Sequence, residues 1–193
     1  ISSVFVEALT RIKRVAGCDV PVLIEGETGT GKELAARAIH YLGRRRNHPF
    51  IPVNCGAIPE NLVENELFGH ERGAFTDARE AQTVLIAQAE GGTLFLDEIE
   101  TLPPKAQAAL LRFLQDRHYR PLGAKSSKQA NLRIMAASNT DLEQLVSNGD
   151  FRQDLMFRLK IMWLTLPPLR ERTGDALFLA EHFLQQFCIE HEI

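Results

Sequence analysis

The segment that most constrains this chain is a glycine-rich stretch between an apolar run and a helical pattern. Residues 22–34 read VLIEGETGTGKEL, in which Gly26, Gly31 and Lys32 fit the pattern GxxxxGK. Glycines allow the main chain to wrap a polyphosphate with its N–H groups directed inward, and the N-terminus of the following helix adds partial positive charge. A strand before the loop and a helix after it favour a phosphate-binding loop over the alternative, a glycine-rich turn without a ligand.

One position of this loop departs from the general pattern. Ser or Thr usually follows the lysine and contacts Mg²⁺, whereas this chain has Glu33. Lys32 is expected to reach the β- and γ-phosphates of a bound nucleotide. The residues expected to bind the nucleotide here are Gly26, Glu27, Thr28, Gly29, Thr30, Gly31, Lys32 and Glu33.

A second chemical centre follows at residues 91–98, which read GGTLFLDE. An apolar strand that ends in two carboxylates places both at the carboxyl edge of the sheet, where such folds bind ligands. Asp97 is expected to contact the nucleotide's Mg²⁺, directly or through water, and Glu98 to orient and deprotonate the attacking water. The alternative is a strand whose end is capped by two solvated acids.

Two asparagines stand at the ends of other apolar runs. Asn139 could sense the γ-phosphate from a neighbouring strand, and Asn54 could hydrogen-bond Glu98 and hold it inactive until a partner engages. For each asparagine, an ordinary cap at a strand end remains the alternative.

Apolar runs alternate with helical patterns along most of the chain, which predicts an α/β fold with a largely parallel sheet between helices. The runs are 20–24, 50–53, 93–96, 132–137 and 161–164, and the helical patterns are 3–16, 32–42, 59–68, 104–116, 141–147 and 175–189. Pro167-Pro168 breaks this alternation. We therefore expect a nucleotide-binding subdomain over 1–168 and the beginning of a small helical lid over 169–193.

Composition narrows the class of protein. The 193 residues carry a formal net charge of −3, so no overall basic character indicates nucleic acid. The three cysteines have no metal or disulfide spacing, which suits the reducing cytoplasm, and no stretch approaches the roughly 20 apolar residues of a membrane span. The run Arg44–Arg46 is expected to be a solvated loop, or else a contact with an acidic partner.

Taken together, these segments resemble the central AAA+ domain of bacterial enhancer-binding proteins, the activators of sigma-54 RNA polymerase. The matching segments are GETGTGKE at 26–33, VNCGAIPENLVENELFGHERGAFTDA at 53–78, GGTLFLDE at 91–98, FRQDLMFRL at 151–159 and LPPLRER at 166–172. With the spacing between them, the resemblance covers essentially the whole chain. It implies an AAA+ P-loop NTPase with a five-stranded sheet, ATP and Mg²⁺ as cofactors, and a glutamate after the phosphate-loop lysine, as at Glu33.

The resemblance also implies a homo-oligomeric ring, usually a hexamer, with ATP sites between subunits. Arg152 and Arg158 match the arginine fingers that enter the neighbouring subunit's site. Such a guanidinium stabilises charge on the γ-phosphate in the transition state. The alternative is a surface helix on which Arg152 pairs with Asp154 or Glu143.

The partner-binding residues implied by the resemblance are Gly73, Ala74, Phe75, Thr76, Asp77 and Ala78. In relatives this loop reads GAFTGA and contacts sigma-54, with Phe75 as the apolar contact and Thr76 as the polar one. A second loop near 120–129 is expected beside it at the pore. Two departures bear on coupling to sigma-54: Asp77 replaces a glycine, and Ala87 stands where relatives carry a glutamate.

The leading hypothesis is therefore a cytoplasmic ATPase motor that remodels sigma-54 RNA polymerase to activate transcription. A regulator that oligomerises on nucleotide without remodelling sigma-54 is the first alternative, favoured by Asp77 and Ala87. An unrelated AAA+ unfoldase or clamp loader is the second, and the insertion at 69–78 argues against it. DNA binding is expected only through a C-terminal domain that this chain lacks.

Overall fold

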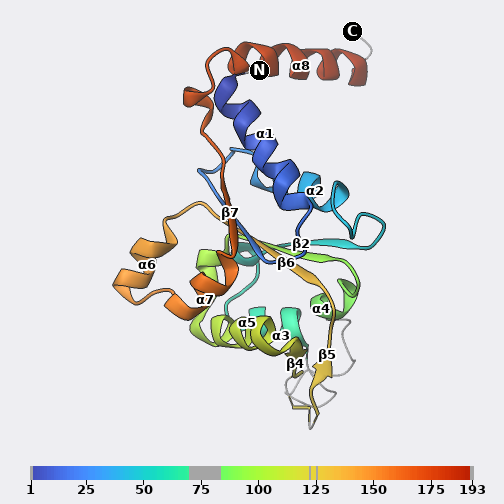
Figure 1. The fold of residues 1–193 in the computed structure, drawn as a ribbon, viewed down its shortest axis with the longest axis vertical. Coiled ribbons are helices and arrows are strands. Elements are labelled where there is room, and N and C mark those ends of the chain that lie inside the picture. The colour runs from blue at the N-terminus through green and yellow to red at the C-terminus, as the bar shows by residue number, and fades with distance from the viewer. Residues whose placement is uncertain (1, 70–83, 122, 125, 192–193) are drawn as a thin grey trace.

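The computed structural model describes residues 2–69, 84–121, 123–124 and 126–191 (Figure 1). Its centre is a five-stranded sheet of order β2-β3-β6-β1-β7, in which all strand pairings are parallel. The strands are β1 (Val22–Glu25), β2 (Phe50–Asn54), β3 (Thr93–Asp97), β6 (Arg133–Ser138) and β7 (Met162–Thr165). The expected five-stranded sheet is confirmed, and Pro52 is tolerated because β2 is an edge strand.

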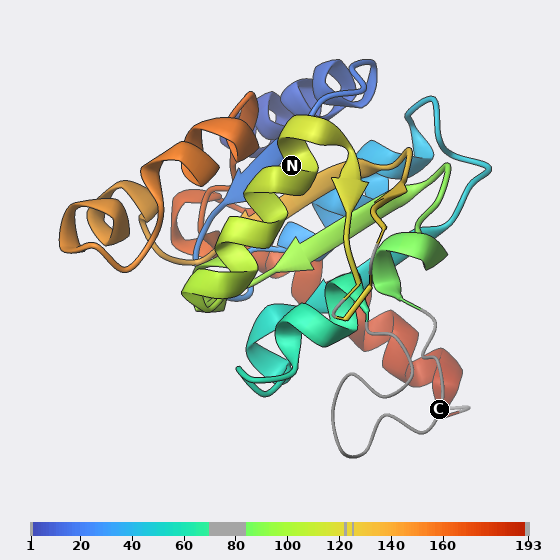
Figure 2. The ribbon, with the colours of Figure 1, turned by 90° about the horizontal axis from the view of Figure 1, so that it is seen from below.

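Helices cover both faces of this sheet (Figures 1 and 2). Helices α1 (Ser3–Ala16) and α2 (Lys32–Tyr41) lie on one face, and α3 (Val63–Phe68), α5 (Pro104–Asp116) and α7 (Gln153–Leu159) on the other. Because side chains alternate along a strand, Leu94 and Leu96 pack towards α3 and α5, whereas Phe95 packs towards α1 and α2. Both faces are therefore buried, as a parallel sheet requires.

Several short elements were not predicted. Helix α4 (Leu85–Gln88) is absent from the sequence interpretation, and α7 appears in it only as the surface helix considered for Arg152, while α6 (Leu142–Asn148) agrees with it. The predicted helix over 59–68 begins later, at Val63. The predicted loop over 120–129 is bounded by a short antiparallel pair, β4 (His118–Tyr119) with β5 (Lys128–Gln129).

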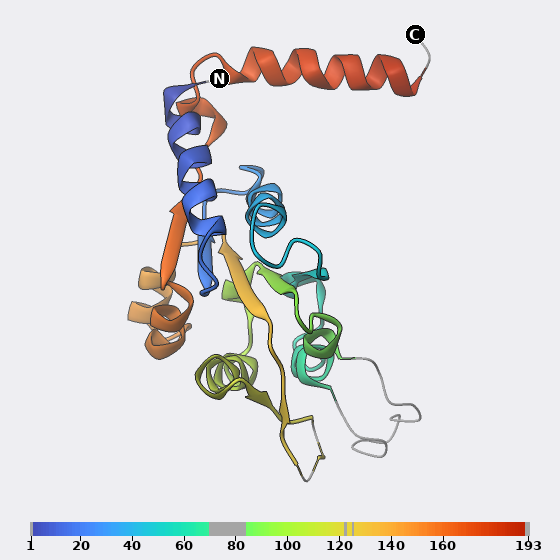
Figure 3. The same cartoon turned by 45° about the vertical axis from the view of Figure 1, so that its right-hand side comes forward.

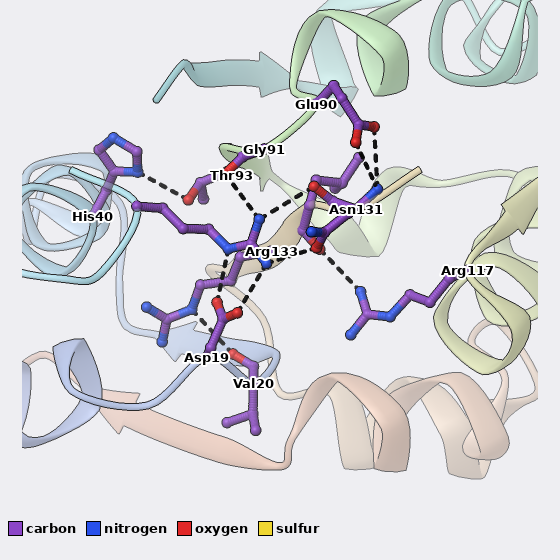
Figure 4. A network of polar contacts seen from close by, with 11 residues as sticks. Asp19, Val20, His40, Glu90, Gly91, Thr93, Arg117, Asn131 and Arg133 are labelled. Carbon is purple, nitrogen blue, oxygen red and sulfur yellow. Dashed lines mark hydrogen bonds and ion pairs between the residues drawn. The ribbon is translucent and has the colours of Figure 1, made fainter. Parts of the chain in front are cut away.

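A network of polar contacts joins the amino ends of the strands (Figure 4). Arg133, at the start of β6, donates to the carbonyls of Val20 and Val15 at 3.1 and 3.0 Å. Arg45 pairs with Asp19 at 2.8 Å and donates to the side chain of Asn131 at 2.8 Å. The expectation of a solvated loop is therefore wrong for Arg45, whose side chain is only 15% exposed, although Arg44 and Arg46 are exposed.

Helix α8 (Asp175–Glu190) extends away from the sheet (Figure 3). Six of its large apolar side chains are exposed, namely Leu177, Phe178, Phe183, Leu184, Phe187 and Ile189. Within the part of the chain that the structure describes, no helix combines the length and apolar character needed to cross a membrane.

Candidate nucleotide-binding site

The glycine-rich loop connects β1 to α2 at the carboxyl edge of the sheet, where the sequence places it. Lys32 is buried, and its Nζ donates to the carbonyls of Gly26 and Glu27 at 2.8 and 3.2 Å. The ammonium group therefore lies within the curve of its own loop. Gly31 has φ +92°, a left-handed conformation that favours glycine, and a Cβ at Gly26 would come within 3.0 Å of the Leu166 carbonyl.

The other side chains of the loop do not converge on the Lys32 ammonium. The hydroxyl of Thr30 donates to the Glu27 carbonyl at 2.8 Å, which stabilises the turn, and Thr28 and Gly29 are exposed. Glu33 pairs with Arg37 one turn along α2, with 2.7 Å between Oε1 and Nη2. These residues can contact phosphate through their main-chain N–H groups, which is how such loops bind anions.

The two acids stand where the sequence predicts them, at the end of β3. Asp97 Oδ1 accepts a hydrogen bond from the Glu98 N–H at 3.0 Å. Burial raises the pKa of Asp97, and this effect is opposed by that hydrogen bond and by the Lys32 charge. Glu98 has φ +53°, an uncommon conformation for a residue other than glycine, and such strain is frequent at functional sites.

Asn54 reaches the same edge from β2, opposite Asp97 in the register of the two strands. Its Oδ1 accepts from the Ala57 N–H at 3.1 Å, so it caps the 3₁₀ turn η1 (Cys55–Ala57). The capping alternative is thus realised, while the proposed contact with Glu98 stays a prediction. Gly56 is a residue that the sequence analysis missed: a Cβ there would overlap the Glu98 carboxylate and lie 3.3 Å from Asn54 Oδ1.

Asn139 follows β6 and lines the same cavity as Gly26 and Glu27 of the phosphate loop. Its side-chain oxygen accepts from the Thr140 hydroxyl at 2.9 Å, and its N–H donates to Glu100 at 3.3 Å. A cavity of about 420 Å³ lies here, lined by Glu25, Gly26, Glu27, Asn139, Thr140, Asp141, Glu143 and Lys160. The structure therefore places Asn139 beside the loop, where it could contact a phosphate.

A more apolar chamber, also of about 420 Å³, adjoins the loop on the side of α1. Its apolar side chains come from α1, α2, α8 and the segment after β7, and they include Phe5, Leu9, Ile12, Leu34, Leu166, Leu169, Leu179 and Phe183. Gly29, Thr30 and Gly31 of the glycine-rich loop form another part of its wall. An apolar chamber beside a phosphate loop suits a flat heterocyclic base. Because residues far apart in sequence line it, sequence reasoning did not find it.

The two predicted arginine fingers lie on or next to α7. Arg152 precedes the helix and forms an ion pair with Asp154 at 2.7 Å, which is one of the two pairings considered as the alternative. Glu143, the other considered partner, pairs instead with Lys160 at 3.1 Å. Arg158 is exposed and forms no ion pair with any residue described by the structure. Neither arginine pairs with Asp97 or Glu98 of its own chain within that described part.

The predicted sigma-54 contact at residues 73–78 lies outside the described residues. The elements on either side of it, α3 and α4, are described, and the β4–β5 pair stands at the same end of the molecule (Figure 1). Among the described residues, no group of three or more His, Cys, Asp or Glu side chains could hold a metal ion by itself. Mg²⁺ in nucleotide sites is usually bound by one or two carboxylates together with phosphate oxygens and water, and the hard oxygen of Asp97 fits that requirement.

Comparison with known proteins adds independent findings. The profile of the sigma-54 interaction domain family matches residues 1–165. The chain is 51% identical over 179 residues to the regulatory protein AtoC of Escherichia coli strain K12, covering 93% of this chain and 39% of that protein. It is 53% identical over 179 residues to the sigma54-dependent transcriptional activator SfnR of Pseudomonas putida, covering 93% and 49%. The chain thus spans less than half the length of these two relatives.

Solved structures agree with this similarity. NtrX from Brucella abortus in complex with ATP superposes with a TM-score of 0.93 at 33% identity, over all of this chain and 41% of that one. The P-loop NTPase domain of the sigma-54 transport activator from E. coli has a TM-score of 0.58 at 23% identity, covering 86% of this chain and 95% of that one. At that identity the second likeness concerns the fold alone.

Proposed function

This chain belongs to the sigma-54 interaction domain family and has its AAA+ P-loop NTPase fold, and from this premise we propose that it is the ATP-hydrolysing core of a ring motor that remodels sigma-54 RNA polymerase. The observation that carries the proposal is the convergence of Lys32, Asp97 and Glu98 at one edge of the sheet. A counter-charge for phosphate, a metal-binding carboxylate and a candidate base are the groups that phosphoryl transfer to water requires.

ATP binding is assigned to the loop and the apolar chamber. The loop N–H groups and the Lys32 ammonium would hold the phosphates, and the chamber beside Phe5 and Leu9 would receive the base. That NtrX was obtained in complex with ATP supports this assignment. Asp97 would bind Mg²⁺, which neutralises charge that develops on the phosphates when it is present.

Hydrolysis is assigned to Glu98, which would orient the attacking water and accept its proton. Asn139 stands beside the loop and could sense the γ-phosphate. Asn54 would hold Glu98 inactive by donating its side-chain N–H to the carboxylate, while its Oδ1 accepts from the Ala57 N–H as it does here. Asp97 is the last residue of the buried strand β3, and Glu98 follows it directly, so both acids stand at the carboxyl end of that strand.

A homo-oligomeric ring, by family resemblance a hexamer, would complete each site with Arg152 and Arg158 of the neighbouring subunit. The Arg152–Asp154 pair is about half exposed, and water screens such pairs so strongly that they contribute little stability. A γ-phosphate, with more charge and more oxygen acceptors, could therefore replace Asp154 as the partner of Arg152.

Residues 1–168 would form the nucleotide-binding subdomain and residues 169–193 the beginning of a helical lid. The exposed apolar side chains of α8 support that division, since a helix of this kind normally packs against others. DNA contact would come through a C-terminal domain outside this chain, and the whole protein would act in the cytoplasm.

A second candidate is a regulator that oligomerises on nucleotide without remodelling sigma-54. Two sequence observations favour it: Asp77 adds a charge to the sigma-54 loop, and Ala87, exposed on α4, offers no carboxylate to couple nucleotide state to the loops.

The discriminating experiment measures sigma-54 binding by the natural full-length protein with ADP–aluminium fluoride, and compares it with the Asp77→Gly variant. Complex formation by the natural protein supports the remodelling motor. Binding by the glycine variant alone would show that Asp77 weakens the contact, and the second candidate would then be the better account.

A further inference from the structure

Two arginines follow Pro168, and each contacts the phosphate loop in a different way. Arg170 is exposed and forms its ion pair with the exposed carboxylate of Glu27, with 2.6 Å between Nη1 and Oε2. Arg172 is only 8% exposed, and its Nη2 donates to the main-chain carbonyl of Thr30 at 3.0 Å. One arginine therefore contacts an exposed side chain of the loop, and the other contacts its backbone.

The guanidinium of Arg172 is held by two hydrogen bonds and an aromatic ring. Its Nε donates to the Pro167 carbonyl at 2.8 Å, and its Cζ lies over the Phe5 ring of α1, 4.4 Å from the ring centre. Its own carbonyl accepts from the Asp175 N–H at 3.0 Å, at the start of α8. The planar fork of arginine can hold several such acceptors at once, which a lysine ammonium on a flexible stem cannot do in the same fixed geometry.

This arrangement determines how the loop presents its amides. The peptide that joins Thr30 to Gly31 is planar and trans, so its carbonyl and its N–H point in opposite directions. Because Arg172 holds the Thr30 carbonyl on one side, the Gly31 N–H is directed to the other. Gly31 has a left-handed φ and could otherwise rotate with little steric penalty, so the orientation needs an external restraint.

Arg172 and Phe5 also both line the apolar chamber beside the loop. The stack of a guanidinium on an aromatic ring therefore forms part of the wall that would receive the base. The same side chain contacts the phosphate end of the site through Thr30 and the base end through Phe5.

We propose that Arg172 is a positioning residue for nucleotide binding, which orients the Thr30–Gly31 peptide of the phosphate loop and shapes the base chamber. The inference rests on the proposed function, because it assumes that this loop binds ATP. Arg170, whose hydrogen bonds within the described part of the chain go to the exposed Glu27 carboxylate, serves as the matched control.

The test measures the dissociation constants of fluorescent ATP and ADP analogues with the natural full-length protein and its Arg172→Gln, Arg172→Lys and Arg170→Gln variants. We expect Arg172→Gln to weaken binding of both nucleotides about tenfold, since hydrogen bonds from charged donors commonly contribute at least that factor. Arg172→Lys keeps a charged donor for Thr30 and should weaken binding about threefold. Arg170→Gln should change it less than twofold.

Thermal unfolding of the nucleotide-free variants separates positioning from folding. If Arg172→Gln is folded at the assay temperature and binds like the natural protein, the inference is overturned. If it does not fold, Arg172→Lys decides, and binding equal to that of the natural protein overturns the inference. If the natural protein binds neither nucleotide, the proposed function and this inference both fail. If it binds ATP without hydrolysing it, only the proposed catalysis fails.

Discussion

Gly56 offers a test of the proposed base that leaves every proposed catalytic side chain in the protein. It lies in the 3₁₀ turn after β2, with the Glu98 carboxylate packed against its Cα. A Cβ at this position would overlap Glu98 Oε2, whereas it would lie 3.3 Å from Asn54 Oδ1. The Gly56→Ala variant should therefore displace Glu98 far more than Asn54.

The size of the effect follows from that overlap. To regain van der Waals contact with a new methyl group, the carboxylate must move by about 1 Å. Because the displaced atom is the end of a flexible side chain, the move should cost little stability. A misplacement of about 1 Å at a reacting group can lower a rate about 10²-fold. We therefore expect kcat for ATP hydrolysis to fall about 10²-fold, which is about 2.7 kcal/mol of transition-state stabilisation.

The assay is phosphate release from ATP by the full-length protein, paired with nucleotide affinity measured by fluorescence. Affinity should change less than about twofold, since no contact of Lys32 with the loop is altered. Gly17→Ala is the matched control, because its Cβ would lie 3.5 Å from the Arg14 carbonyl, an ordinary contact. Hydrolysis by Gly56→Ala at the natural rate would refute the argument that the position of Glu98 governs the chemistry.

Four further predictions follow from the described contacts. Lys32→Ala should abolish ATP binding because the loop loses its phosphate counter-charge, and undiminished affinity in a calorimetric titration would contradict the loop assignment. Glu98→Gln should bind ATP without turning it over, and phosphate release at the natural rate would exclude Glu98 as the base. Burial raises the pKa of Asp97, and only the ionised form binds Mg²⁺ well. As the pH is lowered, Mg²⁺-dependent hydrolysis should therefore be lost at a higher pH than the pKa of an ordinary aspartate would predict. A loss of activity only near the ordinary aspartate pKa would contradict the assignment of Asp97 as the Mg²⁺ ligand. Arg45→Ala should lower the free energy of unfolding, measured by denaturant titration, by roughly 1–3 kcal/mol, because Asp19 and two carbonyls lose a mostly buried donor. Nucleotide affinity of the folded variant should be unchanged.

The sequence predicts the centre of the sheet well because β1, β3 and β6 are buried on both faces. Residues 94–96 and 134–137 are continuous apolar runs, as expected for strands of a parallel sheet that helices cover on both faces. The position of Asp97 and Glu98 follows from the same fact, since the first polar residues after a buried strand must stand at its carboxyl edge.

The missed features depend on contacts between distant parts of the chain. Arg172 and Thr30 are 142 residues apart, and Arg45 and Asn131 are 86 apart, so no local pattern could pair them. Gly56 is informative only once the fold brings Glu98 against it. Helix α7 entered the sequence analysis only as the surface helix considered for Arg152, because seven residues show little helical period.

The charged groups at the amino and carboxyl ends of the strands have different kinds of partner, which separates folding from function: Arg45 has a carboxylate, whereas Lys32 has only neutral carbonyls among its described hydrogen bonds. At the amino edge the charged groups are bonded within the chain, as Arg45 is to Asp19, and they restrain the strands without any ligand (Figure 4). At the carboxyl edge the Lys32 ammonium is bonded to carbonyls of its own loop, which leaves it preorganised for an anion that would bring full negative charge. Substitutions at the amino edge should therefore lower the free energy of unfolding and leave nucleotide affinity unchanged. Substitutions at the carboxyl edge should lower nucleotide affinity and leave the free energy of unfolding unchanged. A variant of Arg45 that bound ATP weakly while fully folded would show that the two edges are coupled through the strands.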